Sequence, residues 1–372
     1  MRIAIFCPSF GQVGGIERKA ELLIAAFRDA GHEVSVIARG ADAPGAGDAD
    51  VPILRLPFHQ LPRRATHVAH HLRFLGRLPG AVGGLRRAVA TTRADAILTL
   101  AIPSYASYVI GLAGAAPLVF SLEIGGPGMR QHPRVMRWAL RRAARVVACA
   151  SPLARTAVAL APEIAARVVV IPNGVDPEPF GPGPAFVHPR RYVLTVARLS
   201  PQKGIDVLLE AFASLGPGAG ELDLLIAGDG PERPALLARR SRLRLDARVH
   251  FLGELDAGSL PALYRGAALV ACPSRWEGLP LVCLEAMASG RAVVASAVDG
   301  TPDAVLDGET GVLVPPEDAG ALARAIESVL RTPGRAERLG ARGAAIVRER
   351  FAWSRVTERY LAVLAEAASG AR

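Results

Sequence analysis

Short apolar runs alternate with amphipathic stretches along almost the whole chain. Residues 3–7 form the first apolar run, a glycine-containing loop follows, and residues 16–30 carry apolar side chains at helical spacing on one face. Residues 34–38 form the next apolar run. A strand, a helix and a second strand in this order predict a parallel βαβ unit.

The same alternation continues towards the C-terminus. Further strands are expected at residues 117–122, 146–150, 168–171, 192–197, 222–227, 249–253, 267–272, 293–296 and 311–314. Further helices are expected at residues 63–77, 134–145, 205–215, 280–290, 319–330 and 354–368. Strands that alternate with helices predict an α/β protein with parallel sheets.

A segment rich in proline and glycine interrupts the pattern at residues 177–189. This composition is typical of a linker, and 372 residues exceed what one hydrophobic core usually holds. We therefore expect two domains, residues 1–187 and 188–353, followed by a terminal helix within residues 354–372.

An uncharged stretch at residues 96–122 raises the question of a membrane span. Pro103, Gly111, Gly114 and Pro117 punctuate it, so a strand, a short helix and a second strand are favoured over a span. No signal-peptide pattern precedes the first strand. The four cysteines include no Cys-x-x-Cys pair, as expected in a reducing compartment. We expect a cytoplasmic protein.

The formal net charge of +10 is concentrated in the first half of the chain. Residues 1–187 contain 21 Lys and Arg against 12 Asp and Glu. Nearly all the cations are arginine, and Lys19 and Lys203 are the only lysines. The first half is therefore where an acidic partner is expected.

Two of the expected helices carry a broad basic face with an aromatic residue inside it. The basic face of the first helix contains Phe74. The basic face of the second helix contains Trp138, and it is formed by Arg134, Arg137, Arg141 and Arg145. Such faces are typical of contact with anionic lipids, here the inner face of the cell membrane. The alternative is a solvated basic face whose aromatic packs on a neighbouring element. No nucleic-acid-binding signature accompanies them, so we expect no nucleic-acid partner.

The segment 274–290 combines the features that nucleotide-sugar binding requires. Glu277 lies in a loop after an apolar run, Gly278 permits a close approach of the backbone, and Glu285 lies early in the following helix. Carboxylates accept hydrogen bonds from sugar hydroxyls. The start of the helix supplies N–H groups that favour phosphate, those of Leu281, Val282 and Cys283. A glutamate in a first helical turn is also favourable without a ligand. The prediction of nucleotide-sugar binding therefore depends on all of these features together and not on Glu285 alone.

Cations and glycines also occur at the ends of other expected strands. Arg198 and Lys203 flank a turn at a helix start, where they could neutralise a pyrophosphate. Glu123 ends a strand before a glycine loop, at the edge where open parallel sheets bind ligands. Gly14 and Gly15 suit a phosphate-facing turn, but the G-x-G-x-x-G spacing is missing, which disfavours nicotinamide binding.

Taken in order, these motifs resemble those of the retaining glycosyltransferases of family 4. The resemblance runs through Gly14 to Arg18, residues 172–176, Arg198, Lys203 with Gly204, residues 228–230, the pair Glu277 and Glu285, and residues 307–311. It implies the GT-B architecture, in which two Rossmann-like domains with parallel sheets face each other across a cleft. In length the chain is similar to bacterial envelope glycosyltransferases of the lipopolysaccharide-core or mannosyl-phosphoinositide type.

The resemblance implies a role for each matching residue. Gly14 and Gly15 would lie close to the donor pyrophosphate and the acceptor, while Arg198 and Lys203 would stabilise the departing diphosphate. Further contacts to the donor are expected at Gly228, Gly253, Gly278, Leu281 and Val282. The terminal helix would cross back to the first domain.

The carboxylates have the remaining roles. The resemblance implies that Glu277 holds hydroxyls of the transferred sugar and that Glu285 holds the ribose hydroxyls of the nucleotide. Glu123 stands where the family commonly has a histidine near the reacting carbon, so we expect Glu123 to bind a sugar hydroxyl instead. No Asp-x-Asp motif is present, and the two cations can replace a metal, so neither a metal nor a cofactor is expected.

The resemblance implies retaining transfer of a sugar from a UDP- or GDP-sugar to a hydroxyl acceptor, and we expect this transfer to be independent of metal. The basic faces favour a glycolipid or lipid-linked saccharide acceptor in envelope polysaccharide synthesis, and a soluble metabolite or natural product is the alternative. A hydrolase that uses Glu277 and Glu285 leaves Arg198, Lys203 and the glycine loops without a role. A non-catalytic, basic, membrane-associated protein is supported only by the charge of the first half.

Overall fold

Every strand described by the computed structural model runs parallel to its neighbours, in two separate sheets. The described residues are 1–11, 15–40, 51–56, 68–100, 114, 116–123, 133–216 and 221–370, with the side chains at 68–78 and 81 excluded. The chain divides into two compact units, Met1–Pro172 with Ser354–Arg372, and Asn173–Trp353. This is the α/β, parallel-sheet class that the hydrophobic pattern predicts.

Unit 1 contains a seven-stranded sheet of order β3-β2-β1-β4-β5-β6-β7. Its strands are β1 (Arg2–Phe6), β2 (Glu33–Arg39), β3 (Ile53–Leu56), β4 (Ala96–Thr99), β5 (Leu118–Leu122), β6 (Arg145–Ala148) and β7 (Val168–Val170). Its helices are α1 (Gly15–Asp29), α2 (Val68–Thr92), α4 (Pro133–Arg142), α5 (Ser151–Leu160), the 3-10 helix η3 (Pro162–Arg167) and α13 (Trp353–Ser369). Strands β4 and β5 are buried along their whole length, as expected of a sheet covered on both faces.

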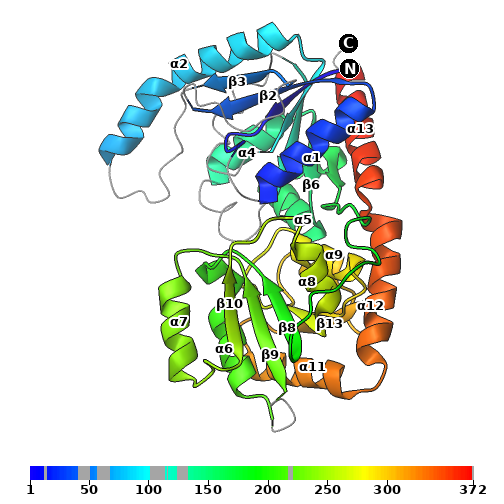
Figure 1. Cartoon of the computed structure of the whole chain (residues 1–372). Helices are drawn as coiled ribbons and strands as arrows, with labels where there is room; N and C mark the ends of the chain where they lie inside the picture. Colours follow the sequence, from blue (N-terminus) through cyan, green and yellow to red (C-terminus); the bar gives the residue numbers. More distant parts are fainter. Residues whose placement is uncertain are drawn as a thin grey trace. The chain divides into compact units, whose positions relative to one another are not determined.

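The C-terminal helix α13 is part of unit 1 rather than an appendage. It runs beside α1 (Figure 1), and the ammonium of Lys19 in α1 lies 5.1 Å from the ring centroid of Tyr360 in α13. Its buried face includes Val356, Val363 and Leu364. Burial of that apolar face holds the end of the chain on the first sheet.

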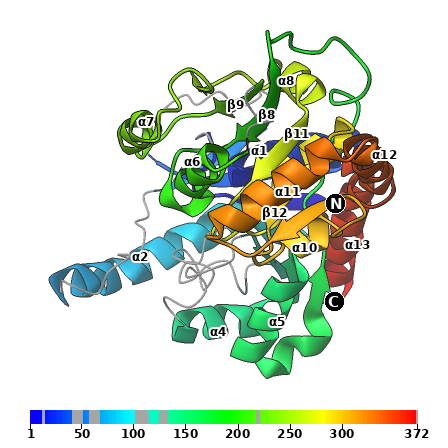
Figure 2. The ribbon, with the colours of Figure 1, turned by 90° about the horizontal axis from the view of Figure 1, so that it is seen from below.

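Unit 2 contains a six-stranded sheet of order β10-β9-β8-β11-β12-β13. Its strands are β8 (Arg191–Val196), β9 (Leu222–Ala227), β10 (Val249–Gly253), β11 (Leu269–Cys272), β12 (Val293–Ser296) and β13 (Gly311–Val314). Its helices are η4 (Pro201–Lys203), α6 (Ile205–Ala213), α7 (Arg233–Arg242), α8 (Leu260–Gly266), α9 (Leu281–Ala288), α10 (Thr301–Ala304), α11 (Ala319–Arg331), α12 (Arg335–Ile346) and the π-helical turn η6 (Val347–Phe351). Helices α6 and α11 lie side by side on one face of this sheet and share its core (Figure 2).

The division between the units differs from the predicted one. The boundary falls after Pro172, and the expected linker at 177–189 belongs to unit 2. Arg265 explains this, because its guanidinium donates to the carbonyls of Pro179 at 3.0 Å and Pro184 at 2.8 Å. The proline-rich segment cannot form a strand, but its backbone acceptors are bound by an arginine from α8.

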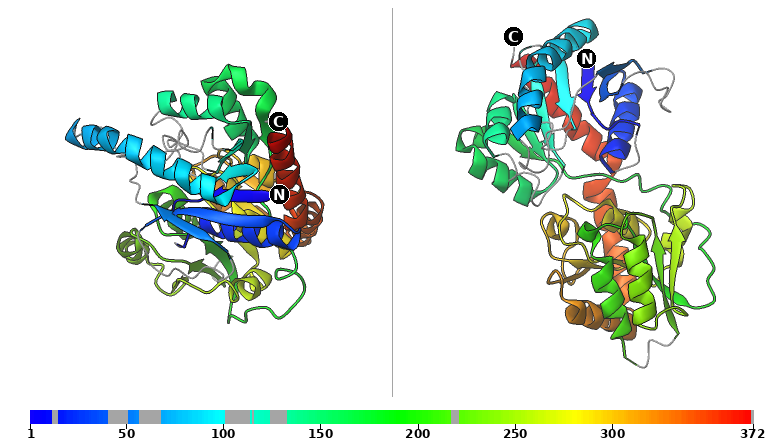
Figure 3. Two further views of the ribbon diagram at one scale, coloured as in Figure 1. Left: turned by 90° about the horizontal axis from the view of Figure 1, so that it is seen from above. Right: turned by 90° about the vertical axis from the view of Figure 1, so that its left-hand side faces the viewer.

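The uncharged stretch at 96–122 contains β4 and β5 at its ends, and the short helix expected between them lies outside the described residues. Helix α2 extends from Val68 to Thr92 despite Pro79, well beyond the predicted end at residue 77 (Figure 3). Among the helices described, none combines the length and the apolar composition needed to cross a bilayer.

Candidate active site

The best candidate site lies at the carboxyl ends of two central strands of unit 2. Strand β8 pairs with β11, and the order of the sheet reverses between them, with β9 and β10 on one side and β12 and β13 on the other. Open parallel sheets bind ligands outside such a switch point. The loops after β8 and β11 carry Lys203 and Glu277.

Glycines allow the loops of this edge to pack backbone against backbone. Gly204 has φ +63°, and a Cβ there would lie 2.1 Å from the carbonyl oxygen of Pro273. A Cβ at Gly228 would lie 2.0 Å from the carbonyl oxygen of Ala197. No side chain fits at either position. Gly204 and Gly228 therefore have a packing role, and contact of Gly228 with a donor stays a prediction. Gly253 has φ +76°, and its carbonyl accepts the N–H of Gly228 at 2.7 Å. Its contact with a donor also stays a prediction.

The loop after β11 is fixed from both sides. Arg275 donates to both carboxylate oxygens of Asp206, at 3.0 and 2.8 Å, and to Glu317 at 2.8 Å. Although burial raises the pKa of Asp206, the hydrogen bonds from Arg275 outweigh it and the pKa is lowered. Gln202 donates to the carbonyl of Trp276 at 2.9 Å. The position of the neighbouring Glu277 is thus set before any ligand binds.

Lys203 and Glu277 form an ion pair within this frame. The ammonium of Lys203 lies 2.6 Å from Oε1 of Glu277, and the hydroxyl of Ser274 donates to the same oxygen at 2.6 Å. Burial lowers the pKa of Lys203, but the carboxylate of Glu277 raises it by more than burial lowers it. The pKa of Lys203 is therefore raised overall. Within the described part of the chain, every side-chain hydrogen bond of Glu277 uses Oε1, so Oε2 is left to accept one from a ligand.

Arg198 lies in the loop that follows β8. It is exposed, and it forms no ion pair with any residue that the structure describes. A guanidinium held near a sheet edge without a carboxylate partner can pair with a phosphate.

The start of α9 and Glu285 complete the candidate site. The N–H of Cys283 donates to the carbonyl of Pro280 at 3.2 Å, so the expectation that it faces an anion is wrong. The N–H groups of Leu281 and Val282 open the helix and have no intrahelical acceptor. Glu285 is buried and accepts a hydrogen bond from the hydroxyl of Tyr264 at 2.8 Å. Gly278, in the loop before α9, is half-buried.

Glu123 has a different environment from the one predicted. It lies inside unit 1, where the ammonium of Lys19 contacts both carboxylate oxygens at 2.9 and 2.8 Å. The Ser121 hydroxyl donates to Oε1 at 2.5 Å and lies 3.0 Å from the hydroxyl of Tyr360. The side chains of Lys19 and Glu123 are only 4% and 3% exposed. This geometry favours a structural role for Glu123 over the predicted contact with a sugar hydroxyl.

The glycine turn of unit 1 is described only in part. Gly15 is the first residue of α1 and is exposed. Gly14 and the glycine loop after Glu123 lie outside the described residues, and their contact with a donor stays a prediction.

The basic face of α4 carries less free charge than the sequence indicates. Arg137 and Arg141 both pair with Oε1 of Glu163, at 3.5 and 2.9 Å. The guanidinium of Arg142 stacks over the ring of Trp138 at 4.3 Å from its centroid. Arg134 is exposed, and the side chain of Phe74 lies outside the described residues. Membrane contact by this face stays a prediction.

Sequence reasoning missed the partners that hold the carboxylates. Ser274 could have been found, because it lies three residues before Glu277 in the same motif. Tyr264 could not, because it lies in another helix, 21 residues from Glu285. Asp299, which accepts the N–H of Glu277 at 3.0 Å, comes from the loop after β12.

Comparison with protein families assigns both parts of the chain. Residues 13–179 match the model described as Glycosyltransferase Family 4, and residues 183–345 match the model described as Glycosyl transferases group 1. The matched ranges include all the residues of the candidate site.

Individual relatives and structures agree with these models. The chain is 34% identical over 279 residues to the GDP-mannose-dependent alpha-(1-6)-phosphatidylinositol monomannoside mannosyltransferase of Mycolicibacterium smegmatis, with 70% of this chain and 72% of that one covered. It is 31% identical over 251 residues to the glycogen synthase of Mycobacterium tuberculosis, with 67% of this chain but only 60% of the synthase covered. The crystal structure of Anabaena Alr3699/HepE with UDP and glucose superposes with a TM-score of 0.80 at 25% identity, over 98% and 99% of the two chains.

Proposed function

The chain belongs to the glycosyltransferases of family 4 and group 1, and from this premise we propose that it moves a sugar from a nucleoside-diphosphate sugar to a hydroxyl acceptor. The observation that carries the proposal is the pair of Lys203 and Glu277 at the switch point of unit 2, in which one oxygen of Glu277 is left for a ligand. Its position supports the donor role that the sequence motifs indicate.

The residues suit the charges that develop during the reaction. The bond between the anomeric carbon and the diphosphate oxygen breaks, so the sugar ring gains positive charge and the diphosphate gains negative charge. Lys203 and Arg198 stabilise the diphosphate, while Oε2 of Glu277 accepts a hydrogen bond from a hydroxyl of the sugar. The N–H groups of Leu281 and Val282 add to the field at the phosphate.

We assign a retaining course to the reaction. The acceptor oxygen attacks the face from which the diphosphate leaves, and the acceptor proton passes to the departing phosphate oxygen. No separate base is then required in unit 2. The two cations supply the charge stabilisation that a divalent metal supplies elsewhere, so we propose that turnover requires no metal. Assignment of the product anomer by NMR and turnover in the presence of a chelator test these two points.

The donor and the acceptor follow from the relatives. The mycobacterial mannosyltransferase uses GDP-mannose by its name, and the Anabaena structure contains UDP and glucose. We propose a GDP- or UDP-sugar as donor and a glycolipid or lipid-linked saccharide as acceptor, used in envelope polysaccharide synthesis at the inner face of the membrane. The basic face of α4 supports this acceptor class over a soluble metabolite.

Release of nucleotide tests the proposal. The protein is incubated with UDP-, GDP- and ADP-sugars, with and without lipid extract, and the free nucleoside diphosphate is measured. We expect release from one base only, and a fall of about 10²-fold in Arg198→Ala. Arg242→Ala is the matched control, because Arg242 is an exposed arginine at the far end of α7. Equal rates in the two variants, or no release from any sugar nucleotide, would contradict the proposal.

A further inference from the structure

A second cluster of polar side chains lies at the opposite edge of the unit 2 sheet. His188 precedes β8, Asp223 is the second residue of β9, and His250 is the second residue of β10. Because the strands are parallel, their amino ends share one edge, away from Lys203 and Glu277. The proposed transferase reaction gives this cluster no role.

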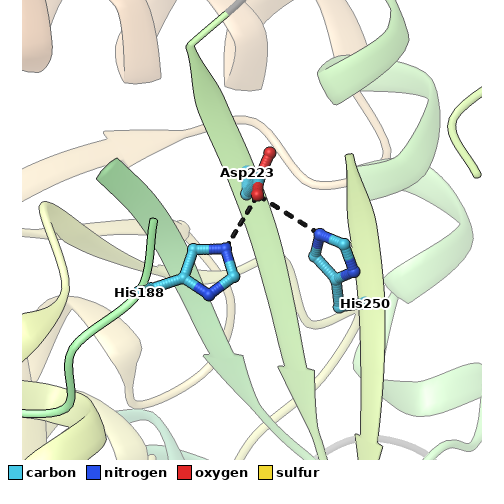
Figure 4. A group of neighbouring side chains, drawn as sticks. All are labelled: His188, Asp223 and His250. Carbon is cyan, nitrogen blue, oxygen red and sulfur yellow. Dashed lines mark hydrogen bonds and ion pairs between the residues drawn. The ribbon is translucent and has the colours of Figure 1, made fainter. Parts of the chain in front are cut away.

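The three side chains converge on one point. Nε2 of His188 lies 2.8 Å from Oδ2 of Asp223, and Nε2 of His250 lies 3.2 Å from the same oxygen. All three ligand atoms lie within 4.8 Å of one another. Figure 4 shows the two imidazoles approaching that oxygen from opposite sides, each with a nitrogen foremost. Among the described residues, no other group of three or more histidine, cysteine and carboxylate side chains has this spacing.

We propose that His188, Asp223 and His250 bind a divalent transition-metal ion of the zinc type. Two imidazole nitrogens and one carboxylate oxygen are a ligand set that Zn²⁺ accepts, with water in the fourth position. Metal–ligand bonds of about 2.0–2.2 Å place the ligand atoms of a tetrahedral site about 3.3–3.6 Å apart. The two contacts to Asp223, at 2.8 and 3.2 Å, are shorter than this, and the three ligand atoms lie within 4.8 Å of one another. The ion therefore replaces the shared protons once the two rings have moved apart from the carboxylate and turned towards each other.

The surroundings orient the ligands. Nη1 of Arg190 lies 3.4 Å from Oδ1 of Asp223, which leaves Oδ2 for the metal. The ring of Tyr192 packs edge-on against His188 at 5.7 Å between centroids. Arg248 is held by the carbonyl of Leu222 at 3.2 Å and so does not occupy the ligand position. The two guanidiniums lower the affinity for a cation, so we expect micromolar rather than nanomolar binding.

The exposure of the ligands gives the ion a route of entry. The side chain of Asp223 is 6% exposed, that of His188 17% and that of His250 37%. The ion enters past His250 and becomes partly enclosed. It then joins the coil before β8 to two strands of the sheet, so its binding stabilises unit 2. This role does not depend on the proposed transfer reaction.

Metal titration of the whole chain tests the site. Protein without an affinity tag is treated with chelator and titrated with ZnCl₂ by calorimetry and with CoCl₂ by visible absorption. We expect one zinc equivalent with a micromolar Kd and the intense d–d bands of four- or five-coordinate Co²⁺. His188→Gln and His250→Gln should each weaken zinc binding by at least about tenfold and abolish the bands. Glutamine keeps an N–H donor for Asp223, so these variants are expected to fold.

A control and a second readout complete the test. His32→Gln should bind both metals as the wild type does, because His32 lies in unit 1 beside the chain amino group. Zinc should raise the Tm of the wild type and of His32→Gln but not that of His188→Gln. Zinc binding that is unchanged in both cluster variants, or an octahedral Co²⁺ spectrum, would show instead that the cluster is only a hydrogen-bonded group.

Discussion

The two lysines of the chain each form an ion pair with a glutamate, one in each unit. The pairs differ in burial and in whether a carboxylate oxygen remains for a ligand. In unit 1, Lys19 contacts both oxygens of Glu123, and the side chains are 4% and 3% exposed. In unit 2, Lys203 contacts one oxygen of Glu277, and the side chains are 24% and 8% exposed. In the first pair both carboxylate oxygens are already bound, and we call it the closed pair. In the second pair one carboxylate oxygen can still accept a hydrogen bond from a ligand, and we call it the open pair.

The same two residue types therefore form an enclosed ion pair in one unit and a pair that can still accept a hydrogen bond in the other. Ser121 and Tyr360 satisfy the pair in unit 1. In unit 2, Ser274 is the one other described side chain that donates to the carboxylate of Glu277, and it uses the oxygen already bound to Lys203. We infer that Lys19 and Glu123 hold α1 and α13 on the first sheet, and that Lys203 and Glu277 bind substrate.

The largest effect is expected from breaking the closed pair. Lys19→Met leaves the carboxylate of Glu123 buried without its cation, which should cost about 3–5 kcal/mol in the free energy of unfolding. Urea denaturation measures this cost. The double substitution Lys19→Met with Glu123→Gln should recover most of it, because no unpaired charge remains. A double variant as unstable as Lys19→Met would show that the charge is not the cause.

Breaking the open pair should affect turnover more than stability. Lys203→Met removes a cation that we propose stabilises the departing diphosphate, and sugar transfer should fall by about 10²–10³-fold. The rate of nucleotide release at saturating donor measures this loss, with the folded fraction checked by circular dichroism. A folded Lys203→Met variant with wild-type turnover would remove Lys203 from the proposed mechanism.

Alkaline pH should weaken both pairs in the same direction. The pKa of Lys19 and that of Lys203 are raised in the folded protein by their glutamates, against the effect of burial. A raised pKa gives stability that is fully present below the unfolded value near 10.5 and is lost as the pH rises through the folded value. Urea midpoints should therefore show no change caused by these lysines between pH 7 and 9, where their stabilisation is fully present, and a fall above about pH 10.5. The fall should be smaller in Lys19→Met, and an equal fall in both proteins would refute the assignment.

A smaller effect is expected where one hydrogen bond from an uncharged donor is lost. Tyr264→Phe removes the hydroxyl that donates to the carboxylate of Glu285, which should cost about 1.5 kcal/mol or roughly tenfold in nucleotide affinity. Calorimetric titration with the preferred nucleoside diphosphate measures it. Tyr192→Phe is the matched control, because its hydroxyl donates at 2.7 Å to the carbonyl of Leu263 rather than to Glu285. Equal nucleotide affinity in the two variants would contradict a role for Glu285 in nucleotide binding.

The smallest effect concerns a third carboxylate, which is exposed. Glu163 neutralises Arg137 and Arg141 on the basic face of α4. Glu163→Gln should strengthen binding to anionic vesicles by up to about fivefold, since a basic residue near such a surface contributes about 1 kcal/mol. Neutral vesicles serve as the control. An affinity for anionic vesicles that changes neither with the substitution nor with the salt concentration would count against membrane contact by α4.

The sequence predicts most of unit 2 because its signals are local. The expected strands at 222–227, 249–253, 293–296 and 311–314 coincide with β9, β10, β12 and β13. Each is a short apolar run followed by a glycine or polar turn, and a buried parallel strand requires such a run. Glu277 stands out because its motif joins a strand, a loop and a helix start within a few residues.

The features that the sequence did not predict depend on contacts between residues that are distant along the chain. Glu123 and its partner Lys19 are separated by 104 residues, so no local pattern indicates that the carboxylate is already bound. The extent of unit 2 is set by Arg265, which binds the proline-rich segment from more than 80 residues away. His188, Asp223 and His250 form no motif in sequence, because three separate elements bring them together.

The most direct test of the two roles is a side-by-side comparison of Glu277→Gln and Glu123→Gln. Both substitutions remove one negative charge and keep the shape of the side chain, and both variants are assayed for nucleotide-sugar turnover and for urea unfolding. We predict that Glu277→Gln loses at least about 10²-fold in turnover and little stability, whereas Glu123→Gln loses stability and keeps its turnover per folded molecule. An equal loss of turnover in folded Glu123→Gln would contradict the division of roles between the two pairs.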